Sequence, residues 1–232
     1  MLSFLVATVP RRKTVLENPI VFEGGRSQLY LYPKDSDSKY VMRCTTPPQP
    51  SAAEIKAGAS VDNSIINPPH HFHVYQEEYF EVVRGTMQVK LDGAHKIVQQ
   101  GETVTIMPGI YHWFSNASES EELVVDIGLN LNSKSRDERF FRNLYSYLED
   151  CNRAGGGEEA VKKGGTAAGG PKTAPNPFQM MLFLHSADVA LALPGLPKFV
   201  GMPLGRALVW VGAMVGKWVC GFSISYPEYY AG

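Results

Sequence analysis

The sequence predicts a mainly β domain, a sandwich or a small barrel, followed by a helical C-terminal extension. Three observations predict it. Short β-branched or aromatic runs, each closed by glycine, proline, aspartate or asparagine, follow one another from Pro19 to Leu131. Apolar residues at helical spacing begin only after Asn132. Helices and strands do not alternate along the chain, which argues against a parallel α/β sheet.

The composition is that of a folded protein with no strong charge bias. The 232 residues are 44% hydrophobic and 19% charged, enough for one sizeable core or two small ones. Lys+Arg is 22 and Asp+Glu is 23, a net charge of −1 that argues against a nucleic-acid partner. The 3 cysteines are scattered and form no CxxC pair. In "MLSFLVATVPRRK" the basic residues follow the apolar run, unlike a signal peptide. We therefore expect a cytoplasmic protein, with membrane association as the alternative.

Changes in composition divide the chain into four parts. Residues 1–131 carry the strand-like runs, and residues 132–152 carry apolar side chains at helical spacing. Residues 153–177 are rich in Gly, Ala, Lys and Pro, which predicts a flexible linker. Residues 178–232 form an apolar tail that is predicted to be helical.

The tail contains two runs that are apolar on every side, Phe178 to Leu193 and Ala207 to Phe222. A helix of this kind is buried in protein or in lipid. Neither run reaches the about 20 uninterrupted apolar residues of a spanning helix. We expect the tail to pack on the β domain or on a second subunit, which would make a homodimer. Peripheral membrane contact through residues 178–222 is the alternative.

The segment "PPHHFHVYQEEYFEVVRG" concentrates potential metal ligands. His71 and His73 are two residues apart, so on a strand both imidazoles project from one face while Phe72 projects from the other. His70 has the opposite parity to its neighbour and is predicted to be a bystander.

A carboxylate and a third histidine complete the candidate set. Glu78 follows His73 closely enough to return on the next strand, and His112 comes from the later segment "GETVTIMPGIYHWFSN". Imidazoles with a carboxylate suit Fe(II), Mn, Ni, Cu or Zn. Without a local cysteine, a structural thiolate zinc site is disfavoured. No GxGxxG or GxxxxGK[ST] fingerprint is present, so no dinucleotide cofactor is predicted.

These residues carry a resemblance to the cupin family. His71-x-His73, four residues, Glu78, six residues and Gly85 match the first cupin motif from its first histidine onward. The second motif is matched by Gly101, Pro108-Gly109, two residues, His112, three residues and Asn116. Two departures concern the barrel rim: Ile65 replaces the leading glycine of the first motif, and the proline of the second lies one residue late.

The resemblance implies a single jelly-roll-like barrel whose metal ligands are His71, His73, Glu78 and His112. A divalent transition metal is implied, with Fe(II) as the leading prediction and Mn, Zn, Ni or Cu as alternatives. Strand parity then adds a substrate pocket, because the ligand-bearing faces also carry the side chains of Phe80, Val82 and Phe114. No catalytic acid or base is predicted.

The remainder of the chain is similar to cupin-domain oxidoreductases of fungal polyketide biosynthetic clusters, in "YLEDC", "FQMMLFLHSADVALALPG" and "YPEYY". This implies a metal-dependent oxidoreductase for a small aromatic or polyketide-type metabolite in secondary metabolism. Two alternatives remain open: a metal-assisted isomerase, cyclase or dehydratase, and a non-enzymatic module that binds a small molecule.

Overall fold

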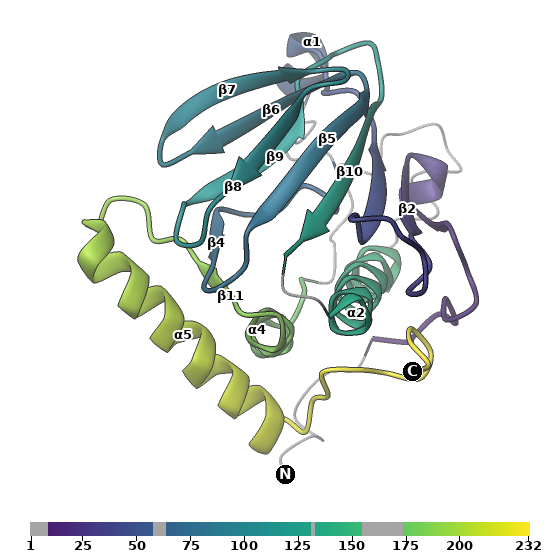
Figure 1. The fold of residues 1–232 in the computed structure, drawn as a ribbon. Helices are drawn as coiled ribbons and strands as arrows, with labels where there is room; N and C mark the ends of the chain where they lie inside the picture. Colours follow the sequence, from purple (N-terminus) through teal and green to yellow (C-terminus); the bar gives the residue numbers. More distant parts are fainter. Residues whose placement is uncertain (1–8, 58–63, 131–132, 155–173) are drawn as a thin grey trace.

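Two antiparallel β-sheets face each other in the computed structural model of the chain, with the longer helices at one end of them and the short α1 (Ala52–Lys56) at the other (Figure 1). The structure describes residues 9–57, 64–130, 133–154 and 174–232. The prediction of a β-sheet domain followed by a C-terminal helix is confirmed. Among the described strands, the pairings give two separate sheets, so closure into a barrel stays a prediction.

The larger sheet has 6 strands in the order β1-β2-β3-β10-β5-β8. Its strands are β1 Ile20–Phe22, β2 Ser27–Leu31, β3 Met42–Thr46, β10 Leu123–Leu129, β5 Glu78–Arg84 and β8 Thr103–Ile106. The smaller sheet has 5 strands in the order β11-β4-β9-β6-β7. These are β11 Val189–Leu191, β4 His71–His73, β9 His112–Asn116, β6 Thr86–Leu91 and β7 Ala94–Gln99.

The core lies between the sheets because apolar and polar residues alternate along most strands. In β5, Phe80 and Val82 point inward, and in β6 Met87 and Val89 do the same. The chain passes from β5 to β6, and so from one sheet to the other, at Gly85 (φ +83°). A Cβ at that glycine would clash with the carbonyl oxygen of Glu122, so the crossing requires glycine.

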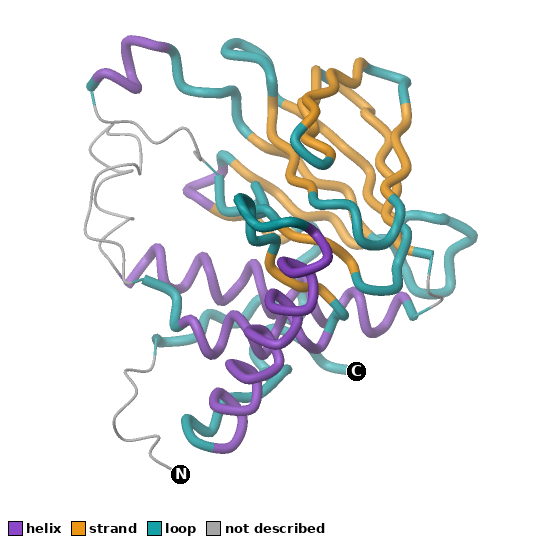
Figure 2. Tube along the Cα trace, turned by 90° about the vertical axis from the view of Figure 1, so that its left-hand side faces the viewer, coloured by secondary structure: helices purple, strands orange, loops and turns teal. Residues whose placement is uncertain are grey.

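Helices cover one end of the sheets, as Figure 2 shows from the side. α2 (Lys134–Ala154) and α4 (Pro177–Ser186) lie beneath the strands, and α5 (Lys198–Trp218) runs along the outside of the molecule. α4 begins with Asn176 as its N-cap and proline in its first turn. Two short elements, η2 (Glu23–Gly25) and α1 (Ala52–Lys56), complete the fold.

The first helix of the tail differs from the prediction: the sequence predicts a helix to Leu193, but it ends at Ser186. Asp188 adopts a left-handed conformation (φ 56°), which breaks the helix. Residues of β11 then pair antiparallel with β4. An unpaired edge at β4 would leave backbone N–H and C=O groups without partners, so strand pairing outweighs the helical preference of these residues.

Most of the second apolar run is helical, but α5 begins earlier than predicted, at Lys198, and ends earlier, at Trp218, so residues 219–222 lie outside it. The predicted helix over 132–152 corresponds to α2. The linker predicted over 153–177 falls mostly on residues 155–173, which lie outside the described residues, so it stays a prediction.

Candidate metal centre and cavity

β4 places two imidazoles on the inner side of the smaller sheet. His71 and His73 are buried and face the interior, while Phe72 between them packs on the opposite side against the ring of Tyr111, with 5.4 Å between centroids. The strand is held on both sides, since β11 pairs with it along its length and His71 lies opposite His112 of β9. The alternation of side chains along β4 therefore places His71 and His73 on one face and Phe72 on the other, as the sequence predicts.

The four predicted ligands converge, although they come from both sheets. Glu78 is the first residue of β5 in the larger sheet, and His112 is the first residue of β9 in the smaller one. One ligand atom from each of the four residues lies within 4.8 Å of all the others. The Oε2 of Glu78 is 2.9 Å from the Nε2 of His112 and 3.5 Å from the Nε2 of His73.

Backbone carbonyls fix the orientation of two of the rings. The Nδ1 of His71 donates to the carbonyl of Pro69 (2.9 Å), and the Nδ1 of His112 donates to the carbonyl of Ile110 (2.8 Å). This hydrogen bond leaves the Nε2 lone pair of each ring directed at the cluster, the arrangement that metal-bound histidines show.

The cluster leaves polar atoms that a cation would satisfy. The Nε2 of His73 is buried without a hydrogen-bond partner among the described residues. His112 faces an acceptor with each ring nitrogen, so without a metal both hydrogen bonds require a protonated imidazole. A divalent cation would accept both lone pairs and offset the carboxylate charge, so these residues fit such an ion.

The pKa values of the cluster follow from burial and from the charges inside it. Burial alone would raise the pKa of Glu78, but His73 and His112 outweigh it and hold that pKa far below its usual value. Burial lowers the pKa of His71 strongly, and the neighbouring imidazoles lower it further. Burial opposes protonation of His73 as well, yet the Glu78 charge prevails and raises its pKa. The cluster therefore combines an ionised carboxylate with a neutral imidazole at neutral pH.

A polar layer that the sequence does not predict lies behind His73. The Nδ1 of His73 is 3.4 Å from the side-chain amide of Gln76, which lies between Asp137 and Arg136 of α2. With its nitrogen turned to the carbonyl of Ala187 (2.9 Å), the Gln76 amide accepts from Arg136. No spacing signal marks these residues, because they meet only through the fold.

Two polar residues of the tail, His185 and Asp188, do not share a helix face, although they lie only three residues apart. Instead, the helix ends between them, His185 is exposed, and Asp188 pairs with the Nη1 of Arg136 at 2.9 Å.

A cavity of about 430 Å³ opens beside the cluster and is mostly apolar. His71, His73 and Glu78 line it on the side of the sheets. Helical residues form the opposite wall, together with two from β11: Phe140, Phe141, Leu144, Tyr145, Leu148, Pro177, Met180, Met181, Leu184, Val189 and Leu191. The sequence motifs do not predict this wall, although the helical spacing of Phe140, Phe141 and Leu144 is a signal for part of it.

Of the three predicted pocket residues, the structure brings only Phe114 to the cavity wall. Phe80 and Val82 are fully buried in the core, outside the lining. The Phe80 ring packs against Phe114, with 5.1 Å between centroids, so it supports the wall from behind. His70 lies outside the four-residue cluster, with its ring stacked 6.0 Å from that of Trp113.

Comparisons with known proteins agree with the motifs. The model of the cupin domain (Cupin_2) matches residues 63–128. "Oxidoreductase iacF" of Pestalotiopsis fici is 31% identical over 157 residues, 66% of this chain and 67% of that protein. "Probable oxidoreductase virH" of Hypocrea virens is 29% identical over 229 residues, 95% of this chain and 90% of that protein. A solved cupin-like protein from Thermotoga maritima overlaps partially, with a TM-score of 0.27, 21% identity, and coverage of 44% of this chain and 56% of its own.

Proposed function

We propose that this chain, which belongs to the cupin family, is a metal-dependent oxidoreductase that acts on a small aromatic, polyketide-type metabolite. The observation that carries the proposal is a buried cluster of three imidazoles and one carboxylate beside a largely apolar cavity. The names of the fungal relatives support an oxidoreductase.

His71, His73, Glu78 and His112 would hold the metal, which we propose to be Fe(II), with Mn, Zn, Ni or Cu as alternatives. Four protein ligands leave coordination positions open for substrate. A bound transition metal would supply redox chemistry and polarise substrate oxygens. The chain itself contributes the fixed tautomers of His71 and His112, which keep the ligand atoms aimed inward without substrate.

The cavity walls favour an aromatic, weakly polar substrate. Phe114, Phe140 and Phe141 present rings to the space, and methionines of α4 offer an adaptable apolar surface. Burial raises the pKa of Tyr145 well above its usual value, so its phenol remains protonated. We assign this hydroxyl, whose one hydrogen bond within the described part of the chain is a long one of 3.4 Å to the carbonyl of Ile66, to binding a substrate oxygen.

The test couples metal content to turnover in freshly purified, untagged protein. We expect close to one transition-metal ion per chain by mass spectrometry, lost in His71→Ala and in His112→Ala. His70→Ala is the matched control and should keep both metal and activity, because His70 lies outside the cluster. Equal metal in all four proteins would overturn the site.

The assay uses 2-hydroxybenzyl alcohol as a probe in an oxygen electrode. Oxidation to the aldehyde removes two electrons and two protons from the alcohol, and dioxygen accepts them to give hydrogen peroxide. We expect dioxygen uptake that matches aldehyde formation. Conversion of an aromatic probe by the metal-loaded protein without dioxygen uptake would overturn the oxidase form of the proposal in favour of a redox-neutral reaction.

A further inference from the structure

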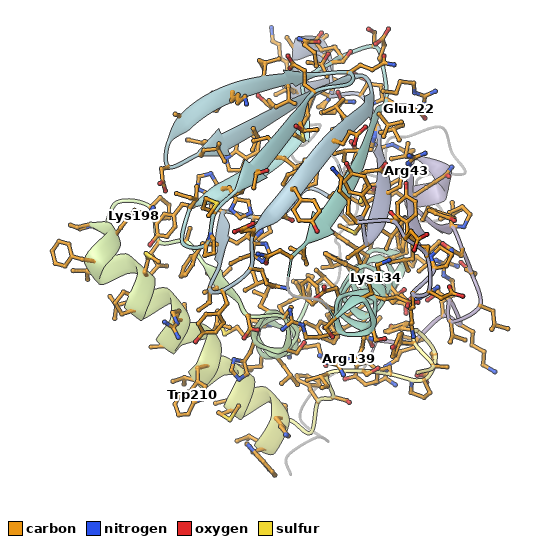
Figure 3. All side chains as sticks on the ribbon, in the orientation of Figure 1. Arg43, Glu122, Lys134, Arg139, Lys198 and Trp210 are labelled. Atoms are coloured by element: carbon orange, nitrogen blue, oxygen red, sulfur yellow. The ribbon has the colours of Figure 1, made fainter. Side chains whose placement is uncertain are left out.

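α5 presents its largest apolar side chains to solvent. Phe199 is 82% exposed, Trp210 is 55% exposed and Trp218 is 65% exposed, and Leu204, Leu208 and Val211 are exposed with them. We call these six residues the outer face of α5. Trp210 lies on the side of the helix turned away from the sheets (Figure 3). Contiguous apolar surface of this kind marks an interaction site.

The inner side of the same helix is built of small residues: Gly201, Gly205, Gly212, Ala213 and Gly216, with Val209 among them. A Cβ at Gly205 would clash with the carbonyl oxygen of Leu191, and one at Gly212 would clash with the sulfur of Met181. An amphipathic helix of a soluble protein buries its large apolar residues, whereas α5 buries its glycines and exposes its tryptophans. The outer face is therefore built to meet something other than water.

The charges of α5 indicate the sign of the charge on the surface that it meets. The helix contains Lys198, Arg206 and Lys217 and no acidic residue. Lys198 pairs with Asp92 at its start (2.8 Å), but among the described residues neither Arg206 nor Lys217 forms an ion pair with a carboxylate. Three turns separate Arg206 from Lys217, so both lie along one flank of the outer face. A basic flank beside an aromatic and aliphatic face is the pattern of helices that lie in the interface of an anionic membrane.

We propose that the outer face of α5 docks on an anionic lipid surface, with the helix lying flat. By length and composition α5 could cross a membrane, and it is the one described helix that could. Its glycine side, however, contacts α4 and β11 along the helix, from Gly205 at Leu191 to Gly216 at Phe178. Crossing a bilayer would strip away these contacts, whereas lying flat keeps them and buries only the outer face.

A second copy of the chain fits this face less well. In an antiparallel twofold contact the same flank of each helix meets its copy, which would place Arg206 and Lys217 beside their equivalents. Like charges brought together at a desolvated contact repel, while anionic headgroups neutralise both residues at once.

Docking would also place the cavity near lipid. α5 packs on α4 and β11, and the inner sides of α4 and β11 line the cavity. Leu191 and Met181 touch the glycines of α5 and also line the cavity. The membrane contact itself does not depend on the chemistry at the metal cluster. The two proposals can therefore fail separately. A metal-loaded, active protein that does not bind vesicles would overturn only the proposal of membrane docking.

The test is sedimentation of the full chain with vesicles of phosphatidylcholine, alone or with about a quarter phosphatidylserine. We expect binding to the anionic vesicles, at least tenfold weaker binding to the neutral ones, and release by salt. Trp210→Ser with Trp218→Ser, and separately Arg206→Glu with Lys217→Glu, should each reduce binding at least tenfold. Leu16→Ser with Ile97→Ser, two exposed apolar residues elsewhere, is the matched control and should bind normally.

Three outcomes would overturn the proposal. Equal binding to both vesicle types would remove the charge argument, and recovery from membranes only with detergent would make α5 a span. The third is a dimer, detected by light scattering without lipid, that the Trp210 and Trp218 changes dissociate. Circular dichroism of each variant shows whether it is folded, and these outward-facing positions leave the packed side of α5 intact.

Discussion

The cavity has two walls of different origin. The strand wall, built by β4, β5 and β9, carries three of the four ligands of the metal cluster, and the helical wall, built by α2, α4 and β11, is almost entirely apolar. The first belongs to the segment that matches the cupin model, and most of the second follows that segment in the chain. The strand wall determines which chemistry is available, and the helical wall determines which molecule can reach it.

The largest expected effect comes from removing most of the helical wall. A chain ending at Ala154 lacks α4, β11 and α5, which leaves the β4 edge unpaired and Phe141 and Leu144 open to water. We expect aggregated material with little soluble protein, measured by size-exclusion chromatography after expression. A soluble, metal-loaded truncation would show that the strands and α2 fold without the tail, and that the helical wall is not needed for stability.

A smaller change tests the contact between α5 and β11. Gly205→Val would force side-chain atoms into the carbonyl oxygen of Leu191, so we expect a loss of about 1–3 kcal/mol in the free energy of unfolding. Ala207→Val introduces the same side chain on the exposed side of α5 and is the control for helix propensity. Urea unfolding of both proteins checks the prediction, and equal stabilities would contradict the close packing.

The two walls also differ in how far the sequence predicts them. His71 and His73 share β4, and Glu78 begins the next strand five residues later, so strand period and motif spacing determine which way they point. The Asp188 pairing, by contrast, depends on Arg136, far away in the chain, and on the end of α4. Helical propensity favoured a continuous helix to Leu193, but the open edge of β4 determined the outcome. Local periodicity cannot show such long-range contacts.

The layer behind His73 connects the two walls, and its expected effect is on metal affinity. Gln76→Ala removes the amide beside the Nδ1 of His73 and its contacts with α2, so this ring would lose its fixed orientation. We expect metal affinity to fall about 10- to 100-fold, measured by competition with a chelator. Glu77→Ala, next in the chain but outside the cavity lining, is the control. Unchanged affinity in Gln76→Ala would mean that the strand wall positions His73 alone.

The smallest expected effect is a pH dependence within the helical wall. Glu149 of α2 is buried, and burial raises its pKa, although the backbone N–H of Glu23 donates to its carboxylate (3.2 Å) and partly opposes this. A carboxyl whose pKa is raised on folding contributes stability that is fully present below its unfolded pKa, about 4.3, and is lost as pH rises through the folded value.

Glu149→Gln keeps a side-chain oxygen that accepts from the backbone N–H of Glu23 and removes the group that titrates. We expect the variant to match the parent near pH 4 and to be more stable than the parent at pH 7, measured by urea unfolding of metal-free protein. Glu119→Gln, exposed in the loop before β10, should follow the parent at both pH values. A Glu149→Gln protein less stable than the parent at pH 7 would mean that the charged carboxylate contributes to holding η2 against the helical wall.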